Sequence, residues 1–246
     1  MSTPQILIYK NADELAKAAA ERFAELARDA IAERGLFRVA LSGGNTPNRV
    51  YSLLASDEFK TRIEWSKVHL FFGDERCVPP DDSESNYRMV LETLISHVEI
   101  PRENVHRIRG EEEPLQSAKL YEAELKEFFA AAGWPRFDLV LLGMGDDGHT
   151  ASLFPQTAAL DERNSWVVAN WVEKLGVYRI SLTVPVINAA ANIAFLVIGS
   201  DKAERLAEVI HGPFDKKRLP SQLIKPTDGT LLWLVDTAAA ALLDTK

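Results

Sequence analysis

The sequence predicts an α/β fold: a single, Rossmann-like domain over residues 1–246, with an open, mainly parallel sheet flanked by helices on both faces. Two observations lead to this prediction. Short apolar runs alternate along the chain with longer segments in which apolar residues recur at helical spacing. The 246 residues also suffice for one large buried core, and no Gly/Ser linker, repeat or low-complexity segment divides them.

The strands are predicted from short apolar runs, because the strands of a parallel sheet covered on both faces are almost continuously apolar. The runs at 166–172 and 178–184 are candidates for an antiparallel pair. In chain order, the predicted strands are residues 6–9, 37–41, 68–72, 137–142, 166–172, 178–184, 194–198 and 231–235.

The helices are predicted from apolar periodicity and from residues that begin or end helices. In helix 13–34, residues such as Leu15, Ala19 and Phe23 recur at helical spacing, and Gly35 ends the helix. Thr46 as N-cap and Pro47 at the first helical position predict a helix over 47–56. The remaining predicted helices are 85–97, 114–132 (closed by Gly133 and Pro135), 201–210 and 237–243.

Composition limits the possible partners and compartments. The net charge of -8 gives no overall attraction for nucleic acid or anionic lipid, so a bound anion needs a local cationic pocket. Cys77 is the single cysteine, which excludes an intrachain disulfide and fits a reducing compartment. The sequence begins without a signal-peptide pattern and has no apolar run of membrane-spanning length. We expect a cytoplasmic protein without nucleic-acid or membrane partners, monomeric or weakly homo-oligomeric.

The segment FDLVLLGMGDDGHTASLFP, residues 137–155, has the glycine spacing of a dinucleotide-binding turn. Three features oppose that interpretation. Pro155 leaves no room for a long crossover helix, Asp146 and Asp147 would repel a pyrophosphate, and the acidic residue expected about 20 positions later is missing. His149, beside two carboxylates that can fix its tautomer, is instead a candidate general base. The alternative is a loop histidine that caps a short helix.

The segment VALSGGNTPNRVY, residues 39–51, combines a strand, a glycine loop and a helix. Gly43 and Gly44 allow a nest of backbone N–H groups, and Ser42 and Thr46 add hydroxyls at the helix N-terminus. The loop lacks the Gly-Lys-Ser/Thr ending of a nucleotide P-loop, so it predicts a site for a phosphate monoester and not for ATP. The alternative is a glycine-rich turn followed by an N-cap.

The segment VHLFFGDERCVPPDDSESNYRM, residues 68–89, places Asp74, Glu75 and Arg76 after a third strand. Arg76 could hold a phosphate or a developing oxyanion, and Asp74 could act as a base or orient one. The alternative is a surface ion pair, which would contribute little to stability.

These three loops should open on one site, because the carboxyl ends of parallel strands meet at one edge of a sheet. Together they supply an anion cradle, a cation and a histidine with acidic neighbours. The sequence has no metal-ligand spacing and no Gly-x-Ser-x-Gly elbow, so we expect neither a metal nor a cofactor. The other histidines are scattered, and His69 lies inside a strand, where a packing role is expected.

The segments LSGGNTPNRVY, FFGDERCVPPDDSESNYRM and LVLLGMGDDGHTASLFP resemble the three signature segments of the 6-phosphogluconolactonase family, in the same order and spacing. YRISLTVPVINAA and FLVIGSDKAERL extend the resemblance over nearly the whole chain. Glucosamine-6-phosphate deaminases and isomerases of the same superfamily carry Asp-Glu-Tyr where this chain has Asp74-Glu75-Arg76, and Asn-Glu-Pro where it has Leu153-Phe154-Pro155. These departures favour the lactonase. A deaminase or isomerase and a non-catalytic sugar-phosphate-binding protein are the alternatives.

The resemblance implies a hydrolase that converts 6-phosphogluconolactone to 6-phosphogluconate in the oxidative pentose phosphate pathway, with a small sugar phosphate as its partner. In this scheme His149 activates water, and Asp146 or Asp147 orients it. The resemblance further implies that Arg76, Arg179 and Lys202 hold the phosphate with the Ser42-Gly43-Gly44 loop. Backbone N–H groups near Gly44 or Gly145 are candidates for holding the oxyanion.

Overall fold

The protein is described by a computed structural model over residues 4–130 and 133–243. Its main sheet contains seven strands, all paired in parallel, which confirms the predicted α/β class. In spatial order the strands are β1 (Gln5–Tyr9), β10 (Thr230–Asp236), β9 (Asn192–Val197), β6 (Leu139–Leu142), β2 (Phe37–Leu41), β3 (Val68–Phe72) and β5 (Val105–His106).

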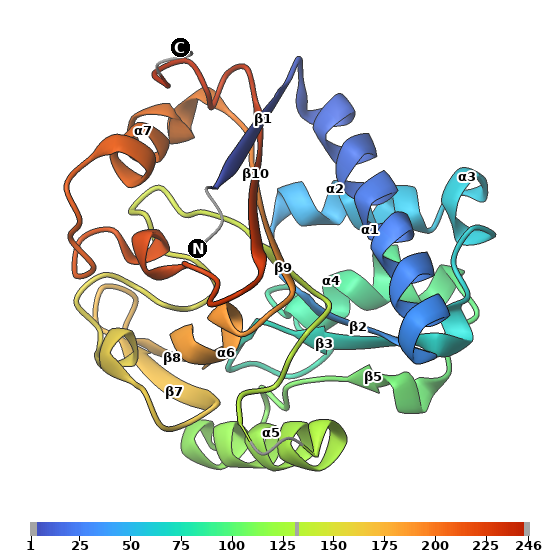
Figure 1. Ribbon diagram of the computed structural model, residues 1–246. Coiled ribbons are helices and arrows are strands. Elements are labelled where there is room, and N and C mark those ends of the chain that lie inside the picture. The colour runs from blue at the N-terminus through green and yellow to red at the C-terminus, as the bar shows by residue number, and fades with distance from the viewer. Residues whose placement is uncertain (1–3, 131–132, 244–246) are drawn as a thin grey trace.

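Helices cover both faces of this sheet (Figure 1). Helices α1 and α2 pack against each other on one face, at the right of the view, whereas α6 and α7 lie on the other. The helices are α1 (Ala12–Arg34), α2 (Asn45–Leu54), α3 (Asp57–Lys60), α4 (Asn86–Thr93), α5 (Pro114–Phe129), α6 (Val184–Asn188) and α7 (Ala203–His211). None of the described helices is long and apolar enough to cross a lipid bilayer.

A second, antiparallel sheet flanks the main one and is formed by β4 (Asp74–Arg76), β8 (Val177–Leu182) and β7 (Val167–Val172). The predicted antiparallel pairing of the two runs near residues 166–184 is confirmed. The sequence did not predict β4, because three charged residues carry no apolar alternation. Helix α5 packs against β7 and β8.

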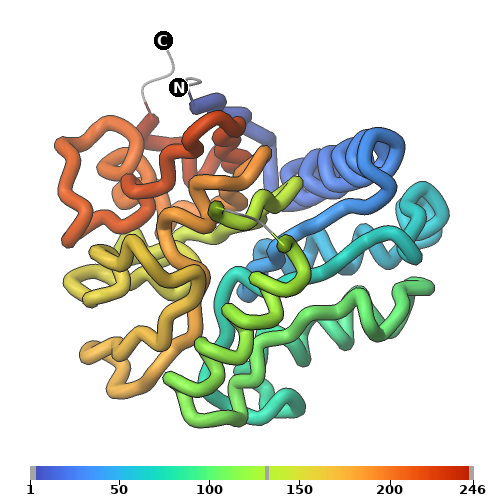
Figure 2. The backbone as a smooth tube through the Cα atoms, turned by 60° about the horizontal axis from the view of Figure 1, so that its bottom comes forward, coloured from blue at the N-terminus to red at the C-terminus, as the bar shows by residue number. Residues whose placement is uncertain are grey.

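The first and last strands of the chain, β1 and β10, lie side by side, so the two ends of the chain are joined by strand pairing (Figure 2). Strand β1 is an edge strand that pairs with β10 in register, from Gln5 opposite Leu232 to Tyr9 opposite Asp236. Buried aromatic side chains from α1 and the central strands fill the core; Phe23 and Phe37, for example, meet edge to face at 5.2 Å between ring centroids.

Several predicted helix ends were wrong for identifiable reasons. Helix α2 begins at Asn45 with Gly44 as its N-cap, and not at Pro47 with Thr46 as N-cap, because Gly44 adopts a φ of +103° that turns the chain into the helix earlier. Helix α4 is capped by the Ser85 side chain and ends at Thr93, ahead of a separate 3-10 turn. Helix α5 ends at Phe129; the predicted extension to 131 and 132 lies outside the described residues.

The predicted helix over 237–243 is wrong, since these residues form turns. The Asp236 carboxylate accepts a hydrogen bond from the Ala239 N–H at 2.7 Å, which stabilises a turn directly after β10. The alanine-rich composition favours a helix, and the Asp236 bond to Ala239 is of the kind that caps a helix N-terminus, but the segment forms only turns.

Candidate active site

One pocket of about 740 Å³ lies at the carboxyl edge of the main sheet. Four neighbouring strands, β9, β6, β2 and β3, end there, as expected for a ligand site in an open α/β sheet. The structure brings every sequence-predicted site residue to this pocket. These residues are Ser42, Gly43, Gly44, Thr46, Asp74, Arg76, Asp146, Asp147, His149, Arg179 and Lys202.

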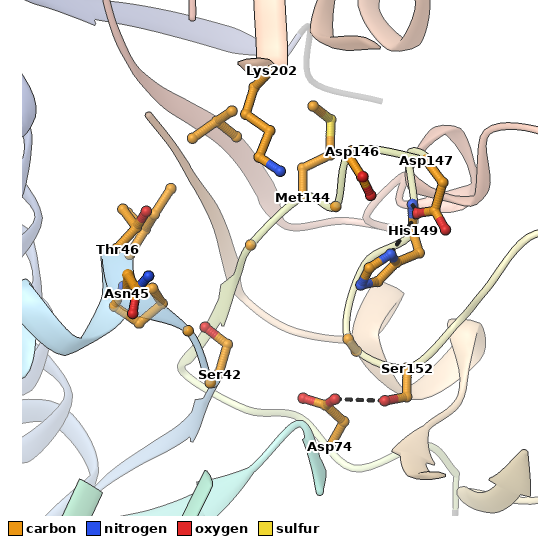
Figure 3. A pocket seen from close by; sticks show the side chains of 18 of the residues that line it. Ser42, Asn45, Thr46, Asp74, Met144, Asp146, Asp147, His149, Ser152 and Lys202 are labelled. Carbon is orange, nitrogen blue, oxygen red and sulfur yellow. Dashed lines mark hydrogen bonds and ion pairs between the residues drawn. The ribbon is translucent and has the colours of Figure 1, made fainter. Parts of the chain in front are cut away.

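His149 is held on two sides. Its Nδ1 lies 2.5 Å from Asp147 Oδ1, and its ring stacks on Phe154 at 4.1 Å between centroids. The other ring nitrogen faces the pocket (Figure 3). Because the carboxylate fixes a proton on Nδ1, Nε2 is free to accept a proton from a bound molecule.

Asp147, and not Asp146, is the carboxylate that contacts His149. Asp147 also accepts the His149 backbone N–H at 3.1 Å and the Lys174 ammonium at 3.2 Å. Burial opposes its ionisation, but the hydrogen bonds and charge of His149, with Lys174, outweigh burial and hold the Asp147 pKa below its ordinary value. Asp146 is exposed, and among the described residues no hydrogen bond joins its carboxylate to His149.

Glycines allow this loop to close on the histidine. The Gly145 N–H donates to the His149 carbonyl at 2.9 Å, so that N–H is already used within the loop. A Cβ at Gly145 would lie only 2.1 Å from His149 Nδ1. Gly148 has a φ of +81°, and its carbonyl accepts the Ser221 hydroxyl at 2.8 Å. The glycine spacing therefore serves the placement of the imidazole.

The opposite side of the pocket has the features of an anion site. Helix α2 directs its N-terminus at the pocket, and Asn45 and Thr46 lie there beside Ser42 (Figure 3). The buried Ser42 hydroxyl has no hydrogen-bond partner among the described residues, which is uncommon unless a ligand supplies one. Gly43 permits the Asn86 side chain to pack closely against this loop, since a Cβ at Gly43 would lie only 1.9 Å from Asn86 Oδ1.

Two arginines occupy the wall formed by the small sheet. Arg76 on β4 is directly opposite Arg179 on β8 in the antiparallel register. Arg76 also donates to the Glu84 carbonyl. Burial, followed by the positive charge of Arg76, lowers the pKa of Arg179 from its ordinary value. Among the described residues, no carboxylate forms an ion pair with either guanidinium, so this wall can accept an anion.

The two acidic residues before Arg76 are buried and do not form a surface ion pair. Asp74 accepts the Ser152 hydroxyl at 2.6 Å, which ties β4 to the histidine loop (Figure 3). Glu75 accepts the backbone N–H groups of Asn86 and Tyr87, both at 2.8 Å, at the start of α4. Burial raises the pKa of Glu75, although these hydrogen bonds act in the opposite direction.

Lys202 reaches the pocket from the segment between β9 and α7 (Figure 3). Its ammonium lies 3.4 Å from Asp201. The segment is anchored by Asp236, which is buried and accepts the Gly199 N–H at 3.1 Å. Because Gly199 has a φ of +98°, it allows the chain to turn from β9 towards the pocket.

The sequence did not single out Lys174 and Leu175, which line the same pocket from the turn between β7 and β8. Both residues follow a predicted strand, but no spacing rule relates that turn to the histidine loop. As to metals, the described part of the chain contains no group of three or more His, Cys, Asp or Glu side chains arranged to hold one.

Comparisons with known proteins agree with this geometry. The family model described as glucosamine-6-phosphate isomerases/6-phosphogluconolactonase matches residues 10–233. A 6-phosphogluconolactonase of Nostoc sp. is 44% identical over 215 residues, covering 86% of this chain and 87% of the relative. One of Haemophilus influenzae is 42% identical over 205 residues, covering 83% and 87%.

The solved structure of 6-phosphogluconolactonase from Trypanosoma cruzi superposes with a TM-score of 0.89 at 29% identity, covering 99% of this chain and 98% of that one. A monomeric glucosamine-6-phosphate deaminase, at 20% identity and a TM-score of 0.80, shares the fold. On the match over residues 10–233 and these identities, the chain belongs to the family of glucosamine-6-phosphate isomerases and 6-phosphogluconolactonases.

Proposed function

We propose that this protein hydrolyses 6-phospho-D-glucono-1,5-lactone to 6-phospho-D-gluconate, a step of the oxidative pentose phosphate pathway. The observation that carries the proposal is the shared pocket. It places a carboxylate-oriented histidine, His149, together with three cations and the N-terminus of α2, whose first turn has no acidic residue. The relatives from Nostoc sp. and Haemophilus influenzae, at 44% and 42% identity, are both named 6-phosphogluconolactonase.

The substrate is a cyclic ester that bears a phosphate at the far end of the molecule. Its phosphate needs cationic and N–H donors, which Arg76, Arg179 and Lys202 supply together with Ser42 and the start of α2. With the phosphate held there, the lactone carbonyl extends towards the His149 side of the pocket. The binding of the phosphate thus positions the ester for attack.

His149 acts as the general base. Its Nε2 removes a proton from a water molecule as the water oxygen bonds to the lactone carbonyl carbon. Asp147 stabilises the imidazolium that forms and keeps the ring oriented. When the tetrahedral intermediate collapses, the bond from that carbon to the ring oxygen breaks, and His149 returns the proton to the ring oxygen. The ring opens, and the single product, 6-phosphogluconate, carries both the new carboxyl group and the hydroxyl released from the ring.

The oxyanion of the intermediate needs at least one N–H donor. Of the two backbone candidates named from the sequence, the Gly145 N–H is engaged by the His149 carbonyl. The Gly44 N–H lies at the start of α2, on the side of the pocket that we assign to the phosphate, so we assign neither backbone candidate to the oxyanion.

Two sequence features separate this function from that of a deaminase or isomerase. Arg76 stands where the deaminases carry a tyrosine, and Leu153-Phe154-Pro155 replaces their Asn-Glu-Pro. In the structure Phe154 stacks on the His149 ring, so the position does not offer a carboxylate for ring opening and deamination.

A coupled assay tests the proposal. Glucose-6-phosphate dehydrogenase generates the lactone, and 6-phosphogluconate formation is followed with wild type, with His149→Ala, and without protein. We expect acceleration by the wild type and a loss of about 10²–10⁴-fold in kcat for His149→Ala, with a modest change in KM. A wild-type rate equal to spontaneous hydrolysis would overturn the proposal. Ammonia release from glucosamine 6-phosphate would then support the deaminase.

A further inference from the structure

The hairpin of β7 and β8 brings an additional cation to the candidate base. Its turn, residues 173–176, projects from the small sheet, and Lys174 and Leu175 both line the pocket that holds His149. The turn is closed by the Gly176 N–H, which donates to the Val172 carbonyl at 2.9 Å, and Gly176 has a φ of +64°. This backbone places the Lys174 side chain over the histidine loop.

The carboxylate of Asp147 is shared between two donors. Oδ1 receives His149 Nδ1 at 2.5 Å, and Oδ2 receives the Lys174 ammonium at 3.2 Å. A carboxylate engaged at one oxygen can rotate about its terminal torsion, whereas one engaged at both oxygens has a fixed plane. Lys174 is 64% exposed and Asp147 only 21%, so the lysine can be replaced without opening the core.

We propose that Lys174 is a positioning residue for His149, acting through the second oxygen of Asp147. The inference rests on the proposed function, in which His149 is the base. Lys174 limits the rotation of the carboxylate, and its positive charge offsets part of the negative charge that faces the imidazole. Both effects favour a neutral imidazole with its proton on Nδ1 and Nε2 directed at the pocket.

The remaining charged groups around this pair do not perform that task. Among the described residues, none of these groups bonds to the Asp147 carboxylate. They lie on the histidine loop, on β4 and β8, and on α7 and the segment that precedes it. They are Asp146, Asp74, Arg76, Arg179, Asp201, Lys202 and Arg205. Glu173, next to Lys174, accepts the Trp171 indole N–H at 2.7 Å and has no hydrogen bond to Asp147 in the described part of the chain.

The first test compares Lys174→Met, which keeps the aliphatic stem, with Lys174→Arg, which keeps the charge. We expect Lys174→Met to lower kcat about two- to fivefold with little change in KM, as fits the loss of an exposed ion pair, and Lys174→Arg to restore most of it. Lys17→Met, on an exposed lysine of α1, is the matched control. A large rise in KM at unchanged kcat would overturn the proposal, because it would assign Lys174 to phosphate binding.

The pH profile gives a second readout. Without the lysine, the Asp147 charge stabilises the imidazolium more strongly, so the acid limb of kcat/KM should move to higher pH by a few tenths of a unit. The shift should disappear in Lys174→Met when Asp147 is already replaced by Asn, since the lysine then has no charge to offset. An equal shift in the Asp147→Asn background would contradict the proposed route.

A measurement without substrate separates this inference from the proposed function. The ring nitrogens of ¹⁵N-labelled His149 report its tautomer and protonation by NMR, with His149→Gln identifying the signal. We expect Lys174→Met to raise the pH at which His149 protonates, whether or not the wild type hydrolyses the lactone. An unchanged titration would refute the role of Lys174, whereas an inactive wild type with a shifted titration would refute only the lactonase.

Discussion

Arg76 and Arg179 face each other across the β4–β8 pair, so two guanidinium-bearing residues share one wall of the pocket without a carboxylate partner in the described part of the chain. Like charges directly opposite on paired strands are unfavourable for folding. Burial lowers the pKa of Arg179, and repulsion from the Arg76 charge lowers it further. A phosphate between them would relieve this repulsion, in agreement with the phosphate-binding role that we propose for the pair.

Replacing Arg179 should therefore separate binding from stability. Arg179→Met keeps most of the aliphatic packing but removes one charge. We expect KM for the phosphorylated lactone to rise about tenfold or more, as for a lost charge-assisted hydrogen bond, while the urea midpoint stays equal or rises. Steady-state kinetics and urea unfolding measure the two quantities. Arg28→Met, on an exposed arginine of α1, is the control, and an unchanged KM for Arg179→Met would remove Arg179 from the phosphate site.

The residues of this pocket could be predicted from the sequence because they follow strands. Ser42, Asp74 and Gly143 each come directly or nearly directly after a run of apolar residues, and parallel strands bring such positions to one edge. The resemblance to the family added Arg179 and Lys202, whose own surroundings in the sequence carry no distinctive pattern.

Other features of the site depend on tertiary structure and could not be predicted, because no sequence pattern indicates them. Asp146 and Asp147 are equivalent by spacing, and the turn built on Gly145 and Gly148 decides which one meets His149. Strand β4 forms from charged residues because β8 offers it an edge. Lys174 reaches Asp147 only when the hairpin folds over the histidine loop, a contact 27 residues apart in sequence.

Gly145→Ala tests whether the glycine loop exists to seat the imidazole. The added methyl group would lie 2.1 Å from His149 Nδ1 and 3.0 Å from Asp147 Oδ1, so the ring must move away from its carboxylate. A displacement of about 1 Å at a reacting group can cost about a hundredfold in rate, and we expect a fall in kcat of that order. Kinetics and near-UV circular dichroism are measured together.

The matched control for that substitution is Gly133→Ala, where a Cβ meets no atom within 4 Å and the residue lies away from the pocket. This variant should keep the wild-type kcat and the wild-type spectrum. If Gly145→Ala also keeps its kcat, the loop tolerates a displaced ring, and the role of Gly145 in placing His149 is wrong.

A pair of histidines outside the pocket, His69 and His106, should make stability depend on pH. His69 on β3 lies 3.1 Å from His106, whose other ring nitrogen lies 2.8 Å from Glu124, and the His69 ring packs on Phe128. The expected packing role of His69 is confirmed by these contacts. Burial, followed by the positive charges of His106 and Arg38, lowers the pKa of His69 to about 4.

The sign of the effect follows from linkage. The pKa of His69 is lower in the folded protein than in the unfolded chain, where it is about 6.5, so on acidification the unfolded chain binds this proton first. The contribution of His69 to stability is complete above about pH 6.5 and is lost as the pH falls towards 4. His69→Gln cannot titrate, and it should lose less stability than the wild type between about pH 7.5 and about pH 5. Urea midpoints at the two pH values measure this, with the exposed His211→Gln as control. Equal losses in His69→Gln and wild type would show that another group governs the acid sensitivity.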